Sequence, residues 1–184
     1  MAAKSATSST KSSQTLKTFA TFRVTGDNLV PDEVTQLLKV QPTHVRLKGK
    51  PYSTGKSGNI IPSTNIWFFS TDTVVFSKNI FDHIRLVLFI LGLMGSGGAE
   101  ILDATLNGRS TQFAGLVALK SLLERSPAKA AMTIFWHGSS GSTVPRIPDG
   151  LFDVLRLIDV TVDVDFDKDE DDLGRIGRGR RKSA

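Results

Sequence analysis

Residues 20–49 read ATFRVTGDNLVPDEVTQLLKVQPTHVRLKG, and this stretch predicts a strand, a helix and a second strand in close order. Apolar and polar side chains alternate over residues 17–25, which is the period of a strand with one buried face. Pro31 suits the first position of a helix because its missing N–H needs no partner there, and Asp32 and Glu33 follow where the helix dipole favours negative charge. Pro42 should end the helix, and residues 45–47 predict a short strand with a basic outer side.

The rest of the chain continues to alternate between strand and helix patterns. We expect a helix that starts at Ser77 as N-cap and ends before Gly95. Its residues 86–91 are apolar on every side, which indicates either burial or contact with a partner. Residues 49–63 are rich in Gly, Ser, Thr, Pro and Lys, and predict a loop. Further strands are expected at 65–70, 100–106, 130–137 and 160–166, and further helices at 113–125 and 148–158.

Strands and helices mixed in this order favour an α+β sandwich. We expect one mainly antiparallel sheet covered by helices on one face, in ferredoxin-like or duplicated ferredoxin-like fashion. Duplication is suggested because Val30–Asp32 and Ile147–Asp149 open helices at similar distances after Phe19 and Phe135. Chance explains this repeat almost as well, because Pro-Asp is a common way to open a helix.

Three features together resemble one protein family: the opening stretch, the strand that contains Trp67, and the last strand, Val162-Asp163-Val164-Asp165-Phe166. The chain is similar to the bacterial family known as domain of unknown function 4279 from about Leu16 to Asp167. The resemblance implies a fold, and it transfers no catalytic residue. The match is strongest at Gly26-Asp27, Pro31-Asp32-Glu33, Leu37-Leu38, Gln41-Pro42-Thr43 and Gly49.

The composition indicates one globular domain with two irregular ends. The chain has 184 residues, 40% of them apolar, which is enough for a core. We expect a disordered Ser/Thr/Lys-rich head at 1–15, an α+β domain at 16–168, and a disordered tail at 169–184 that is acidic and then basic. The absence of cysteine excludes disulfides and thiolate chemistry. The longest apolar run, Leu86–Met94, is too short to span a bilayer, so we expect a cytoplasmic protein without membrane contact.

The basic tail accounts for the net charge of +5. Flexible cationic segments bind phosphates without sequence specificity, so nonspecific nucleic acid is one possible partner. No aromatic residue accompanies these cations, and short basic tails commonly serve only solubility. The charges belong to Arg175, Arg178, Arg180, Arg181 and Lys182.

The last strand carries the one candidate metal site. Asp163, Asp165 and Asp167 are two residues apart, so they share one face of the strand and offer oxygen ligands to a hard cation. A metal-dependent hydrolase is therefore one alternative, and it requires these carboxylates to lie in a cleft. A solvated outer face that discourages edge pairing is the favoured interpretation. The EF-hand pattern is broken by Lys168 and Gly174.

Other short segments resemble catalytic or nucleotide-binding motifs but lack the residue spacing that those motifs require. Gly55-Lys56-Ser57 has no upstream glycine at the P-loop distance, and the glycines at 95–98 follow a helix instead of a strand. The three histidines are isolated from one another. Residues 138–141, Gly-Ser-Ser-Gly, lack the spacing of a nucleophile elbow. We therefore expect no cofactor.

These observations favour a non-enzymatic binding or interaction module, with a protein as the expected partner. Cations and aromatic side chains surround the long loop, where they could form a binding surface. An ordinary solvated loop beside one core tryptophan explains the same residues. The candidates are Arg46, Lys48, Lys50, Tyr52 and Trp67.

Overall fold

The computed structural model describes residues 14–53, 58–93 and 114–169. The predictions for residues 1–13 of the head, for a strand at 100–106 and for most of the tail lie outside these ranges. Thr15, which the prediction placed in the head, begins the first strand. The elements are β1 (Thr15–Gly26), α1 (Pro31–Leu38), β2 (His44–Arg46), β3 (Tyr52–Ser53), β4 (Asn59–Ile60), β5 (Asn65–Ser70), α2 (Ile80–Ile90), α4 (Ala114–Arg125), β6 (Lys129–Gly138), α5 (Asp149–Arg156) and β7 (Val160–Lys168).

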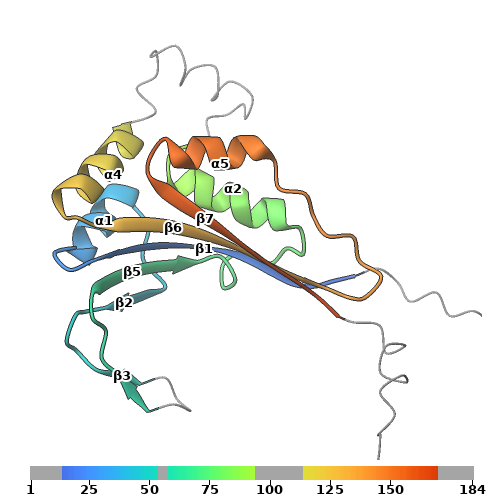
Figure 1. Ribbon diagram of the computed structural model, residues 1–184, viewed down its shortest axis with the longest axis horizontal. Coiled ribbons are helices and arrows are strands. Elements are labelled where there is room, and N and C mark those ends of the chain that lie inside the picture. Colours follow the sequence, from blue (N-terminus) through green and yellow to red (C-terminus); the bar gives the residue numbers. More distant parts are fainter. Residues whose placement is uncertain (1–13, 54–57, 94–113, 170–184) are drawn as a thin grey trace, which may run out of the picture.

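Five strands form one sheet in the order β2-β5-β1-β6-β7 (Figure 1). The first strand of the chain lies at the centre and pairs antiparallel with both β5 and β6. β2 pairs antiparallel with β5, whereas β7 pairs parallel with β6. The sheet is therefore mainly antiparallel, with one parallel pair at the edge.

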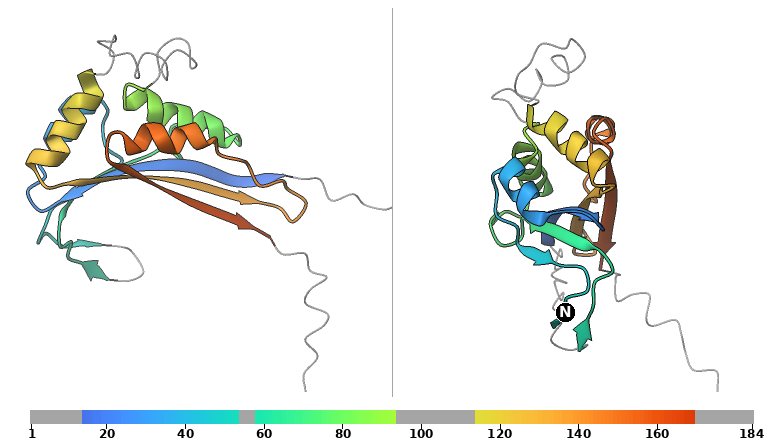
Figure 2. Two further views of the ribbon diagram at one scale, coloured as in Figure 1. Left: turned by 45° about the horizontal axis from the view of Figure 1, so that its top comes forward. Right: turned by 90° about the vertical axis from the view of Figure 1, so that its left-hand side faces the viewer.

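The described helices all lie on one face of this sheet (Figures 1 and 2). The reason is the alternation along the central strands, because every second side chain points to the same side. On β1 these are Ala20, Phe22 and Val24, none of them more than 1% exposed. They belong to one cluster with Trp67, Met132 and the inward faces of α1, α2 and α5.

Helix α1 begins and ends as its sequence predicts. Pro31 occupies its start, and the N-cap Val30 provides no side-chain hydrogen bond. Lys39 ends the helix in the left-handed region, with φ 53°. Val34 and Leu38 are buried, which anchors the helix to the sheet.

Two local predictions were wrong. Residues 49–63 were expected to be a plain loop, but they contain a short hairpin in which Tyr52 pairs with Ile60. The N-cap of α2 is Asn79, whose side chain accepts the N–H of Phe81. The hydroxyl of Ser77 instead accepts the N–H of Asn79 and donates to Asp82. Ser77 therefore caps the turn that precedes the helix, two residues before the N-cap.

The broader fold prediction is confirmed: a mostly antiparallel sheet with helices on one face. The strand order does not establish the narrower ferredoxin-like assignment. Helix α1 connects β1 to the parallel strand β2, and helix α5 connects β6 to the parallel strand β7. The two units differ because β5 lies between β1 and β2, whereas β6 and β7 are direct neighbours. No helix in the described part of the chain is long and apolar enough to cross a membrane.

Gly138, the last residue of β6, is a close-packed position. A Cβ there would overlap the ring of Trp136, and it would lie 2.8 Å from the Cβ of Ser142. We expect Gly138→Ala to lower the free energy of unfolding by about 1–3 kcal/mol because the indole must move. Gly150 in α5 is the matched control, since a Cβ there meets nothing within 4 Å. Urea denaturation of both variants decides this, and equal stability of the two would contradict it.

Candidate functional site: the uncovered face of the sheet

No described helix covers the other face of the five-stranded sheet, which we call the open face (Figure 2). The strand registers determine which side chains lie there, because paired residues share a face. They are His44 and Arg46 from β2, Ile66, Phe68 and Ser70 from β5, Lys17, Phe19, Thr21, Arg23 and Thr25 from β1, Lys129, Ala131, Thr133, Phe135 and His137 from β6, and Thr161, Asp163, Asp165 and Asp167 from β7.

Aromatic side chains on the three central strands, β5, β1 and β6, form what we call the aromatic middle of the open face. Phe19 and Phe135 are cross-strand partners, and their rings stack with centroids 4.6 Å apart. The ammonium of Lys17 lies 5.0 Å from the centre of the Phe19 ring. Phe68 stacks on His44 at 6.0 Å. These rings are only half-buried, although rings of this size usually lie in a core.

Charges are separated across the open face. Arg23 lies between Phe68 and Ala131, with Lys129 nearby, and both cations are exposed. Together with His44 and Arg46 they form what we call the basic end. Arg23 pairs with Ala131 of β6, and Ala131 pairs with Thr161 of β7, so these three residues lie in one row across the strands. Farther along β7 lie the exposed carboxylates that we call the acidic end, Asp163, Asp165 and Asp167.

These charges are largely unused within the fold. Arg23, Lys129, Asp163 and Asp165 make no side-chain ion pair or hydrogen bond with any other residue in the described ranges. Their charges are therefore available to a partner.

The hairpin β3–β4 projects from the β2 side of the sheet, away from the helices (Figures 1 and 2). We call it the arm. Arg46 fixes its base, because its guanidinium stacks on Tyr52 at 3.9 Å and donates to the phenol oxygen at 2.7 Å. Lys48 pairs with Asp27 at 3.0 Å, while Lys50 is exposed. These four candidates thus lie together at or near the arm.

Trp67 does not belong to this group. It is fully buried on the helix side of the sheet, and its indole N–H donates to the hydroxyl of Thr35 at 3.0 Å. Its burial fits the alternative interpretation, a core tryptophan beside the loop, and alternation places its neighbour Phe68 on the open face instead.

The candidate metal ligands Asp163, Asp165 and Asp167 are exposed on the edge strand β7, whereas a hydrolase would need them in a cleft. Among residues 14–53, 58–93 and 114–169, no three acidic, His or Cys side chains are grouped closely enough to hold a metal ion. The tail cations at 175–182 lie outside the described residues.

A buried histidine has a structural role. His83 is 1% exposed and lies 2.7 Å from the hydroxyl of Thr71 and 2.9 Å from the carbonyl oxygen of Ser77. Thr71 in turn accepts the N–H of Ala20 at 2.9 Å. This network ties α2 to the central strand, and every polar atom in it has a partner.

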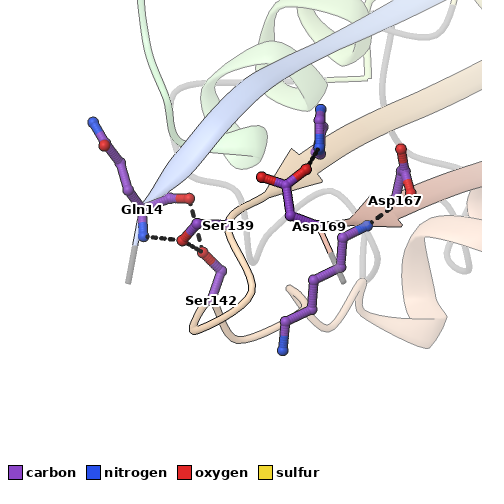
Figure 3. Close-up of polar contacts among 7 residues, drawn as sticks. Gln14, Ser139, Ser142, Asp167 and Asp169 are labelled. Atoms are coloured by element: carbon purple, nitrogen blue, oxygen red, sulfur yellow. Dashed lines mark hydrogen bonds and ion pairs between the residues drawn. The ribbon is translucent and has the colours of Figure 1, made fainter. Parts of the chain in front are cut away.

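Serines at the end of β6 form a clip that holds the start of β1 (Figure 3). Ser139 accepts the N–H of Gln14 at 3.0 Å, and Ser142 donates to the carbonyl oxygen of Gln14 at 2.8 Å. The two hydroxyls lie 3.0 Å apart. The nearby His137 bonds Asp169 at 2.9 Å. Among the described residues, no acidic or basic side chain is hydrogen-bonded to Ser139. The arrangement therefore holds the two chain segments together and lacks an activated nucleophile within the described part of the chain.

A hollow of about 430 Å³ lies between α5 and the first residues of β7. Its lining joins Phe152 and Val160 with one cation, Arg156, and one carboxylate, Asp159. The hydroxyl of Thr161 in this hollow is already bonded to the carbonyl oxygen of Ala130. The residues that line this hollow include no acid–base pair and no activated nucleophile.

The open face was not predicted, although the sequence contains a signal for it: aromatic residues at outward positions of three strands. Phe19, Phe68 and Phe135 occupy the outward phase of their strands, where a solvated face would carry polar residues. Large rings in both phases indicate a second covered face. That they meet depends on the pairing of β1 with β5 and β6, which alternation alone does not fix.

One of three comparisons with known proteins found a match. No curated protein and no solved structure matches the chain. One family model, described as "Domain of unknown function (DUF4279)", matches residues 15–167 and so spans every described strand and helix except the last residue of β7. The chain therefore belongs to the DUF4279 family.

Proposed function

We propose that this protein is a non-enzymatic interaction module that binds a protein partner through the open face. The observation that carries the proposal is the aromatic middle of that face, Phe19, Phe135 and Phe68, left half-buried beside unpaired charges. Interfaces favour such aromatic anchors with charges around them.

A protein fits the open face better than a nucleic acid does. Bases stack on free ring faces, but the Phe19 ring already stacks on Phe135 and has the Lys17 ammonium over it, while His44 covers one side of Phe68. The carboxylates of the acidic end would also repel phosphates. Binding of nucleic acid by the tail remains a separate hypothesis, which the experiment below distinguishes.

The test uses tagged full-length protein and extract of its own cells. Wild type, Phe68→Asp and Phe89→Asp are compared, since Phe89 is 67% exposed on the helix side and serves as the matched control. We expect one identified protein to be retained by wild type and Phe89→Asp, and retention to fall at least tenfold with Phe68→Asp, because a charge is placed in the aromatic middle. The captured protein is then purified and binding is repeated with the two components alone.

Three results would contradict the proposal. Loss with Phe89→Asp but not with Phe68→Asp would place the interface on the helices. Retention of nucleic acid alone, abolished by nuclease or by ending the chain at Asp172, would favour the tail. Full retention by both variants would exclude the open face. Circular dichroism of each variant verifies that the fold is kept.

A further inference from the structure

The separation of charge on the open face points to one particular occupant, which rests on the proposed function above. The basic end and the acidic end lie apart on the same face. Phe68 shares its cross-strand row with Arg23 of the basic end, whereas Phe19 and Phe135 share theirs with Asp165 of the acidic end. We infer that a second copy of this chain packs face to face on the open face, in a two-fold symmetric dimer.

Symmetry makes the charge pattern self-complementary. A two-fold axis that lies between two such faces, perpendicular to the line joining the charged ends, places the basic end of each copy over the acidic end of the other. Arg23 and Lys129 then approach Asp163 and Asp165 of the second copy. Each contact occurs twice, and Phe68 of one copy lies toward Phe19 and Phe135 of the other.

The size of the face agrees with a dimer of moderate affinity. With strands about 4.8 Å apart and about 3.3 Å per residue, the five strands present about 600 Å² per copy. The pair buries about 1,200 Å², which is at the lower end of specific interfaces. The arm stands on the same side as the open face and adds contacts at the rim (Figure 2).

The charge pattern of the open face selects a second copy as the partner, while the aromatic rings contribute buried apolar area. Lys17 lies near the acidic end and offsets part of its charge, but three carboxylates remain against this one cation. An acidic partner would be repelled by the acidic end and a basic one by the basic end. A surface with both signs in the reverse arrangement avoids both penalties, and a second copy provides it.

Sedimentation of the purified full-length protein tests the dimer. Two variants reverse one end each: Arg23→Glu with Lys129→Glu, and Asp163→Lys with Asp165→Lys. We expect each variant alone to associate at least tenfold more weakly than wild type, because like charges then face each other. An equimolar mixture of the two should dimerise again, since each reversed end meets its complement.

The matched control is Arg85→Glu with Arg156→Glu, which changes the same charge on the helix side, where these side chains are 65% and 78% exposed. It should dimerise like wild type. Added salt should weaken the wild-type dimer, and this readout needs no variant. A monomeric wild type up to about 100 μM, or variants that dimerise unchanged, would overturn the inference.

The two proposals can fail separately. A monomeric wild type whose extract partner is still lost with Phe68→Asp would overturn only the second-copy inference. A monomeric wild type with no Phe68-dependent partner would overturn both.

Discussion

Trp67→Ala is expected to lower the free energy of unfolding by about 3–5 kcal/mol, the range for loss of a buried aromatic side chain. Trp67 is 0% exposed, with its ring 6.3 Å from that of Phe22 and 6.5 Å from that of Phe69. The truncation also removes the hydrogen bond that joins β5 to α1 through Thr35. Urea denaturation followed by circular dichroism measures the loss.

Phe68→Ala is the matched comparison, because it truncates the next aromatic residue of the same strand. Phe68 lies on the open face, so we expect a cost of only about 1 kcal/mol. Trp67→Phe should cost less than half as much as Trp67→Ala, since a ring still fills most of the site. If Phe68→Ala were as destabilising as Trp67→Ala, the open face would be part of the core and its assignment as an interaction surface would fail.

His83→Leu is expected to lower the free energy of unfolding by about 2–4 kcal/mol. Leucine fills the site but leaves the buried hydroxyl of Thr71 and the partly buried carbonyl oxygen of Ser77 without their ring partner. The segment between β5 and α2 should lose protection first, so hydrogen exchange over residues 71–80 should rise more than over β6.

His44→Leu is the control for this change, since His44 is exposed and contacts Phe68 mainly by stacking. Its effect should stay within about 0.5 kcal/mol. A His83→Leu variant as stable as wild type would show that the network does not hold α2 on the sheet.

Strand and helix positions were predictable wherever local periodicity decides them. Residues 20–49 gave a strand, a Pro-started helix and a strand return, and α1 begins at Pro31 in the structure. The expected alternation of Ala20, Phe22 and Val24 with outward residues is confirmed. The N-cap of α2 was predicted wrongly as Ser77, because a serine near a helix start can cap either the helix or the turn before it. Only the path of the backbone decides between the two.

The candidate site was less predictable because it depends on pairing between distant strands. Arg46 and Tyr52 are close in sequence, and their contact forms within one local segment. Phe19 and Phe135 meet only because β1 inserts between β5 and β6, which no periodicity specifies. The burial of Trp67 was not predictable for the same reason: its strand carries large residues in both phases.

Photo-crosslinking in the protein's own cells tests the role of the open face most directly. A benzoyl-phenylalanine replaces Phe68 in one strain and Phe89 in another, so that two phenylalanine positions on opposite sides of the sheet are compared in the full-length chain. We expect a protein adduct from position 68, with the mass of a second copy if the dimer forms, and none from position 89. Adducts from position 89 alone, or from neither position, would contradict the assignment of the open face as the interaction surface.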